Sequence, residues 1–230
     1  MKLAPEGRII IVPLVLIILF IYGYSILFSN LNILLLFFSI LLLFSINFFR
    51  DPYRLLPEGD NYIISPADGK IVAIKKFNDP DLGSSQLISI FLNVFNVHVN
   101  RMPIAGSFVK VDYKTGKFLA AFDHNASDEN ERTEITINSK VGLIKVKQIA
   151  GLIARRIICY ASEGNSMEIG GRLGFIRFGS RTDLIIPDHI DVDVKLGQKV
   201  IGNKTIIGTY EWILISQKKI IQKDILYLIF

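Results

Sequence analysis

The stretch YIISPADGKIVAIK, residues 62–75, shows the pattern on which the fold prediction rests. Short runs rich in Ile and Val are separated by a Ser-Pro-Ala-Asp-Gly segment. Pro and Gly interrupt regular structure, whereas β-branched residues favour strands. The stretch therefore predicts two short strands joined by a turn.

The same alternation of short apolar runs and turn residues continues along the chain. Runs rich in Ile, Val and Phe alternate with turns that contain Gly, Asn or Asp, without long 3.6-period stretches, and this spacing predicts an all-β domain. The expected strands are Tyr62–Ile64, Lys70–Lys75, Gln86–Val94, Glu134–Ile137, Val141–Ile149, Arg155–Tyr160, Leu173–Phe178 and Asp183–Ile186. The segment VDVKLGQKVIG, residues 192–202, resembles biotinyl and lipoyl modules, so we expect a sandwich or barrel-sandwich domain. The polar segment 119–132 predicts a surface loop, and residues 211–230 fit either a last strand or a surface helix.

Uncharged apolar runs precede the β-rich region, at Ile9–Phe28 and Leu31–Phe49. Each is close to the ~20 residues that a helix needs to cross a bilayer. Only Ser29-Asn30 lie between them, which predicts a tight antiparallel helical hairpin over residues 1–50. A secretory signal has a shorter apolar region and is not followed directly by a second long run. The alternative to a spanning hairpin is one that enters a single leaflet.

Positive charges flank both ends of the hairpin. Lys2 and Arg8 precede it, and Arg50, Arg54 and Lys70 follow it. Positive residues mark the cytoplasmic side of membrane proteins. We therefore expect a cell-membrane protein whose β-rich domain, residues 51–230, faces the cytoplasm.

The composition limits the classes of partner and metal site that we expect for this protein. The chain has a formal charge of +5, but no Lys/Arg run or aromatic-basic stripe indicates nucleic acid, so an anionic lipid surface is the expected partner. The single cysteine, Cys159, excludes an intrachain disulfide and a Cys-rich metal site. His98, His124 and His189 lack ligand-like spacing, so no metal site is predicted. His124 and His189 stand in polar loop contexts and are expected at the surface.

The segment LGFIRFGSR, residues 173–181, places a Gly-Ser pair at the end of an apolar run. Glycine lets another group approach its carbonyl closely and permits a strained backbone. Ser180, next to Gly179, is a candidate nucleophile. An ordinary turn is the alternative reading of the pair.

Asp68 and His98 are the other candidates for chemistry. Asp68 lies in an Asp-Gly pair, for which plain turn chemistry is the alternative. His98 lies in FNVHVNRMP, residues 95–103. If Val94–Val99 is a strand, alternation places His98 and Asn96 on one face. A structural histidine is the alternative there.

Together these segments resemble one family. SPADG, FNVHVNRMP, NASDENER (residues 125–132) and RFGSR occur in the order found in the short, archaeal-type phosphatidylserine decarboxylases. The glycines at 197, 202 and 208 also fit this family's pattern, and an N-terminal apolar anchor is usual in it. The resemblance runs from about Arg50 to Thr209.

The resemblance implies a pyruvoyl enzyme. Ser180 Oγ would attack the Gly179 carbonyl, and autocatalytic cleavage of this zymogen would give a β chain, residues 1–179, and an α chain, residues 180–230. Ser180 would become the pyruvoyl group. Its carbonyl would form a Schiff base with the serine amine of phosphatidylserine, and loss of CO₂ would give phosphatidylethanolamine. No pyridoxal phosphate motif is present, and related head groups stay open as substrates.

The resemblance also implies roles for other residues. His98 would take the Ser180 proton, and Asp68 would orient His98 and stabilise its charged form. His98 is also our choice for protonating the product carbanion. The arginines considered for the lipid phosphate are Arg101, Arg177 and Arg181, and the phenylalanines considered for an apolar pocket wall are Phe95, Phe175 and Phe178. Ordinary solvated arginines and core phenylalanines are the alternatives.

Other classes of function stay open. A membrane-tethered, lipoyl-like adaptor would explain the hairpin and the glycine-punctuated strands, but it gives no reason for Asp68, His98 and Gly179-Ser180 to occur together. A serine autoprotease would stop after cutting itself. For the decarboxylase, we expect a phospholipid substrate and a heterodimer of the α and β chains, with a higher oligomer open.

Overall fold

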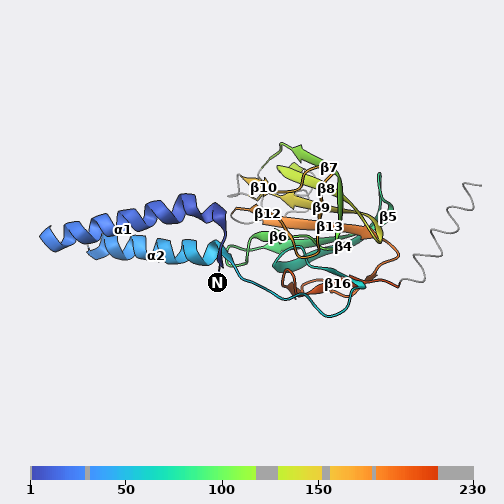
Figure 1. Ribbon diagram of the computed structural model, residues 1–230, viewed down its shortest axis with the longest axis horizontal. Helices are drawn as coiled ribbons and strands as arrows, with labels where there is room; N and C mark the ends of the chain where they lie inside the picture. Colours follow the sequence, from blue (N-terminus) through green and yellow to red (C-terminus); the bar gives the residue numbers. More distant parts are fainter. Residues whose placement is uncertain (1, 29–31, 118–128, 152–155, 178–179, 212–230) are drawn as a thin grey trace, which may run out of the picture.

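A helical hairpin projects from one end of a β-rich body in the computed structural model (Figure 1). The structure describes residues 2–28, 32–117, 129–151, 156–177 and 180–211. The expected hairpin connection, most of the expected loop over 119–132 and the tail from residue 212 lie outside these ranges. The mainly β fold with an N-terminal helical pair is confirmed.

The hairpin consists of α1 (Arg8–Phe28) and α2 (Asn32–Phe48), which lie side by side (Figure 1). Their outer surface is apolar: the exposed fractions of Phe20, Ile33 and Leu43 are 75%, 86% and 67%. Among the described residues, the segment Pro5–Ile26 has the length and composition of a membrane span, whereas α2, with 17 residues, is shorter. The exposed apolar surface indicates that the hairpin associates with a membrane.

Short elements close the base of the hairpin. Strand β1 (Lys2–Leu3) pairs antiparallel with β2 (Arg50–Asp51), and the 3-10 helix η1 (Pro5–Gly7) leads into α1. The backbone N–H of Ala4 donates to the carbonyl of Phe49 at 2.7 Å. Both ends of the hairpin are therefore fixed to each other where they meet the β-rich body.

An antiparallel sheet of eight strands forms the larger layer, in the order β11-β7-β8-β9-β13-β5-β4-β15. Its strands are β4 (Gly69–Asp79), β5 (Gly83–Leu92), β7 (Gly106–Lys114), β8 (Arg132–Ser139), β9 (Gly142–Ile149), β11 (Ser166–Met167), β13 (Ser180–Pro187) and β15 (Lys199–Val200). Strand β13 is central, because β5 and β9 pair along its two edges. Every residue of β13 before Pro187 is buried.

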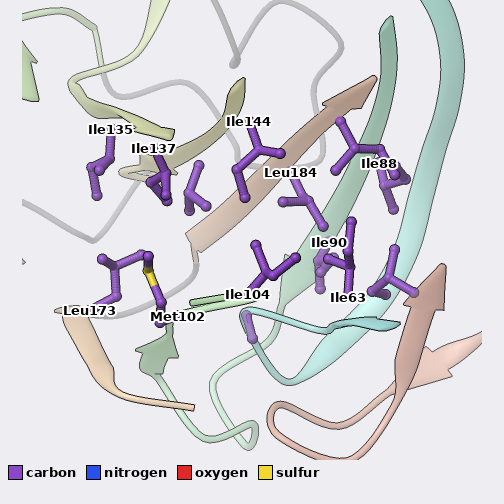
Figure 2. Close-up of a cluster of buried hydrophobic side chains, with 14 of the residues drawn as sticks. Ile63, Ile88, Ile90, Met102, Ile104, Ile135, Ile137, Ile144, Leu173 and Leu184 are labelled. Atoms are coloured by element: carbon purple, nitrogen blue, oxygen red, sulfur yellow. The ribbon is translucent and has the colours of Figure 1, made fainter. Parts of the chain in front are cut away.

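Two smaller antiparallel sheets pack against the large one. They are β10 (Ile157–Cys159), β12 (Arg172–Ile176) and β6 (Val99–Arg101), in that order, and β14 (Asp191–Val192), β16 (Ile206–Thr209) and β3 (Tyr62–Ile64). Figure 2 shows the core between the layers, where Ile90 and Leu184 of the large sheet lie near Ile63 and Ile104. These aliphatic side chains are buried, and their removal from water is the main term that holds the sheets together.

Each run predicted as a strand contains one, within the described residues. The strand considered for Val94–Val99 is wrong, because only its last residue is extended and paired. The side chain of Asn93 accepts the N–H of Phe95, and that of Asn96 accepts the N–H of Asn93, both at 2.9 Å. Asparagine side chains that bond nearby backbone groups favour turns over strands. His98 therefore lies in a loop between β5 and β6.

Candidate active site

Ser180 is the first residue of β13 and pairs in register with Leu92 of β5. Its side chain is fully buried, and Oγ has no hydrogen-bond partner among the described residues. Buried hydroxyls in native proteins are nearly always bonded, so an exception calls for a functional reason. Gly179 and Phe178 lie outside the described residues.

His98 is also fully buried. Its Nδ1 lies 2.9 Å from the carbonyl oxygen of Asn96, while Nε2 has no hydrogen-bond partner in the described parts of the chain. Because a carbonyl only accepts, the neutral imidazole carries its proton on Nδ1 and leaves the lone pair on Nε2. Nε2 is therefore arranged to accept a proton.

The strand pairing brings the His98 loop and the segment that leads to Ser180 to the same part of the fold. Leu92 pairs with Ser180 in the large sheet, and Val99 pairs with Phe175 in the small sheet. The N–H of Ile176 donates to the carbonyl of His98 at 3.3 Å. Two segments, 93–98 and the chain between Ile176 and Ser180, thus link the same pair of sheets.

Burial sets the ionisation of His98. The pKa of His98 is lowered from 6.5 to about 4, chiefly because burial removes water from around the imidazole; the charge of Arg50 acts in the same direction. The Asn96 carbonyl and Asp68 act in the opposite direction. At neutral pH the imidazole is uncharged and able to act as a general base.

Asp68 is held by Arg54 rather than by His98. Arg54 Nη2 donates to Asp68 Oδ2 at 2.8 Å, and Arg54 Nη1 bonds Oδ1. The N–H of Gly202 also donates to Oδ1, at 2.9 Å. The imidazole of His98 therefore forms no hydrogen bond with Asp68, the residue predicted to orient it, and the Asn96 carbonyl orients it instead. Asp68 acts on His98 through its charge.

A buried amide network supports β13 and was not predicted. Asn100 Nδ2 donates to Thr182 Oγ1 at 3.0 Å, and Gln148 Nε2 donates to Asn100 Oδ1 at 2.8 Å. All three residues are fully buried. Ser180 and Thr182 share a face of β13, because alternate residues of a strand point the same way. The sequence feature that could have indicated a role for Asn100 is its position within the FNVHVNRMP segment.

The three arginines considered for the lipid phosphate lie in different environments. Arg181 is buried and donates to Asp183 at 2.7 Å and to Ser89 Oγ at 2.6 Å. Strand alternation places it on the face of β13 opposite Ser180. Arg177 is half-buried, and its Nε has no partner among the described residues. Arg101 is half-buried and forms an ion pair with Asp51.

A cavity of about 400 Å³ opens beside Arg54 and Arg101. Its wall combines segment 52–56, which follows the hairpin, with Ile169, Gly170 and Asn203. Neither Arg177 nor Arg181 is among its lining residues. The cavity is therefore lined by two arginines, each ion-paired with an aspartate, and by apolar residues. Within the described parts of the chain, no three His, Cys, Asp or Glu side chains come together as metal ligands.

The phenylalanines considered for an apolar pocket wall also lie in different environments. Phe175 is fully buried, and its ring centroid lies 6.3 Å from that of His98. Phe95 is 66% exposed and does not wall a buried site. Phe178 lies outside the described residues.

Residues 41–208 match the family model described as phosphatidylserine decarboxylase. The match includes Asp68, His98, Gly179 and Ser180. The chain belongs to the phosphatidylserine decarboxylase family. The family predicted from the sequence motifs is confirmed, as is the prediction of an enzyme; the archaeal-type subfamily stays a prediction.

Curated relatives agree with the family assignment. A protein of Chlorobium limicola is 45% identical over 177 residues, which cover 76% of this chain and 84% of the relative. A protein of Ehrlichia chaffeensis is 51% identical over 170 residues, which cover 72% and 75%. A protein of Ehrlichia ruminantium (strain Gardel) is 50% identical over 173 residues, which cover 74% and 76%. All three are named phosphatidylserine decarboxylase proenzyme.

Proposed function

We propose that the chain decarboxylates phosphatidylserine to phosphatidylethanolamine and CO₂, after autocatalytic cleavage between Gly179 and Ser180 converts Ser180 to a pyruvoyl group. One observation carries the proposal. The Oγ of Ser180 and the Nε2 of His98 are both buried without hydrogen-bond partners among the described residues. The relatives named as proenzymes support a maturation step, which we assign to this place.

The surroundings of Ser180 fit a pyruvoyl group. Forming the group removes the hydroxyl and the amide nitrogen of residue 180. Since Oγ has no partner in the described structure, losing it breaks no side-chain hydrogen bond there. The ketone would supply the electron sink that decarboxylation of an amino acid requires. Serine itself has no such carbonyl.

In cleavage, His98 Nε2 would accept the proton of Ser180 Oγ as that oxygen attacks the Gly179 carbonyl carbon. The imidazolium would return this proton to the Ser180 nitrogen as the peptide C–N bond breaks, and an ester would join Gly179 to the Ser180 side chain. Loss of a proton from the Ser180 Cα then expels the Gly179 carboxylate. Hydrolysis of the resulting dehydroalanine releases ammonia and leaves the ketone.

Asp68 assists through its charge. Protonation of His98 creates a buried cation, and Asp68 raises the pKa of His98 against the effect of burial. The ion pair with Arg54 and the N–H of Gly202 hold this carboxylate in place. The direction of the effect supports a role for Asp68 in stabilising the protonated imidazole. The same imidazolium is the proposed proton donor to the product carbanion.

The proposed site for the lipid phosphate is the cavity beside Arg54 and Arg101. A guanidinium binds a phosphate through charge-assisted hydrogen bonds. Because Arg101 lines the cavity, it is the arginine of the predicted set that we assign to the phosphate; Arg177 and Arg181 do not line it. The neighbouring segment 52–56 follows directly on the membrane hairpin, which supports the assignment of this cavity to a lipid head group.

The cleaved chains are expected to stay together. Strand β13 begins at Ser180 in the α chain, and its partners β5 and β9 belong to the β chain. Separation would expose a strand that is buried along its whole length before Pro187. We place the heterodimer in the cell membrane, with the catalytic domain on the cytoplasmic side. A higher oligomer stays a prediction.

Intact-mass analysis of protein purified from membranes tests the proposal. We expect fragments 1–179 and 180–230, with an α-chain N-terminus that resists Edman degradation and is consumed by borohydride plus an amine. The protein should release CO₂ from phosphatidylserine vesicles. Ser180→Ala should remain one uncut, inactive chain. A full-length wild-type chain would indicate the adaptor, and a free Ser180 amine would indicate an autoprotease.

A further inference from the structure

Phe48, the last residue of α2, packs directly on His98. Their ring centroids lie 4.2 Å apart with an angle of 34° between the planes, and neither side chain is exposed. Phe48 belongs to the membrane hairpin, whereas His98 belongs to the loop between β5 and β6. The hairpin therefore supplies a wall that covers the imidazole.

An apolar cluster, separate from the main core, holds this contact. The ring of Phe48 meets those of Phe49 and Phe175 edge-on, with centroids 5.0 and 6.1 Å apart. Phe49 and Phe175 stack at 5.6 Å. The cluster also buries Ala4, Val97 and Val99. It joins the end of α2 to β12 and to the segments on both sides of His98.

Polar contacts fix the hairpin against the domain around this cluster. Arg50 Nη2 donates to the carbonyl of Phe95 at 2.6 Å, and Arg50 Nη1 donates to Asn47 Oδ1 at 2.9 Å. Glu6, just before α1, accepts from Arg172 Nη2 at 2.6 Å. These contacts make the hairpin a docked part of the catalytic domain and not a flexible tether.

We propose that Phe48 is a positioning residue for His98, which keeps water from the imidazole and holds it against the Asn96 carbonyl, so that the membrane hairpin forms part of the catalytic centre. This inference rests on the proposed function, in which His98 is the base. The charged groups that act on His98 are Arg50, which follows α2, and Asp68, in the turn before β4. Removing the Phe48 ring would admit water and raise the pKa of His98 from about 4 toward 6.5.

The test is the pH dependence of self-cleavage in the full-length chain reconstituted in lipid. A base must be neutral to act, so the cleavage rate falls at pH values below the pKa of His98. Phe48→Ala should move this acid limb upward by more than one pH unit. It should also slow cleavage at neutral pH by about tenfold, part of the ~100-fold or more that a positioned base contributes. Phe48→Leu keeps an apolar cover but loses volume. Its cleavage rate and the pH of its acid limb should lie between those of the wild type and of Phe48→Ala.

Phe20→Ala is the matched control, because Phe20 is a phenylalanine of the same hairpin with 75% of its side chain exposed. It should leave both the rate and the acid limb unchanged. A Phe48→Ala chain with the wild-type rate and acid limb overturns the inference. If Phe48→Ala does not fold, Phe48→Leu decides: an unshifted acid limb in that variant overturns the inference equally.

A second readout separates this inference from the proposed function. In the uncut Ser180→Ala background, NMR titration of the His98 imidazole does not depend on cleavage. Phe48→Ala should raise the pKa of His98 there too, and an unchanged titration contradicts the inference. Absence of cleavage in the wild type, by contrast, contradicts the proposed function and leaves the titration result standing.

Discussion

The carboxylate of Asp68 is paired with the guanidinium of Arg54, which comes from the segment after the membrane hairpin. The pair is largely buried, with side-chain exposures of 16% for Arg54 and 11% for Asp68. Arg54 Nη1 also donates to the carbonyl of Gly202 at 2.9 Å. One ion pair thus joins the chain near residue 54, the turn before β4 and the turn after β15.

Arg54→Met should destabilise the protein by about 2 to 4 kcal/mol, because it leaves a buried carboxylate without its cation. For a chain of this size the melting temperature in detergent should fall by roughly 5 to 15 °C. Lys117→Met breaks an ion pair with Glu129 in which the two side chains are 71% and 41% exposed. This control should leave the melting temperature unchanged. Equal effects of the two variants would show that the Arg54–Asp68 ion pair contributes no more to stability than an exposed ion pair does.

His98 should make stability depend on pH. The folded-state pKa of about 4 lies below the ordinary value of 6.5, so the unfolded chain binds the proton more readily between these values. Stability should therefore rise as pH increases from about 4 to 6.5, by at most about 3 kcal/mol from this group. Melting temperatures measured across this range in the Ser180→Ala background should show a flatter profile after His98→Gln. Parallel profiles for the two proteins would contradict the buried, neutral imidazole.

The hairpin and most strands could be predicted because their signals are local. Apolar length marks α1, and runs of Ile and Val mark β5 and β9. Strand β7 (Gly106–Lys114) was missed because it lacks an Ile- and Val-rich run, and a register shift between Phe108 and Lys110 leaves Phe108 as its one buried residue.

The partners of the candidate site residues could not be read from the sequence. Asp68 and His98 were selected by their motifs, but their contacts depend on residues far away in the chain. Arg54 reaches Asp68 across the turn, and Phe48 reaches His98 from the hairpin. Such contacts follow from how the sheets and helices pack, and no local pattern around residues 48 or 54 encodes them.

Asn100→Ala should both destabilise the protein and slow its self-cleavage. The substitution leaves the buried amide of Gln148 and the hydroxyl of Thr182 without a shared partner, at a cost of about 1 to 3 kcal/mol. Because Thr182 shares a strand face with Ser180, the start of β13 should also be held less firmly. Gel analysis of cleavage over time and thermal melting measure the two effects. Asn138→Ala, at an exposed position of β8, should change neither; an Asn100→Ala chain that matches it would exclude the network from supporting the site.

Arg101→Gln should raise the KM for phosphatidylserine by about tenfold, with a smaller change in kcat, because a charge-assisted hydrogen bond to the lipid phosphate contributes about 1.5 to 3 kcal/mol. Asp51 would keep a partner in this variant, since its Oδ2 lies 3.5 Å from Arg172 Nη1. Arg172→Gln is the control for the Asp51 ion pair, because Arg172 also contacts Asp51 but does not line the cavity. Its loss of the Glu6 bond at the base of the hairpin should affect kcat and not KM. Initial rates in mixed micelles with varied phosphatidylserine give both constants, and intact mass verifies that both variants are fully cleaved. Only a KM effect confined to Arg101→Gln supports the cavity as the phosphate site; equal KM values in the two variants would assign Arg101 to the Asp51 ion pair alone.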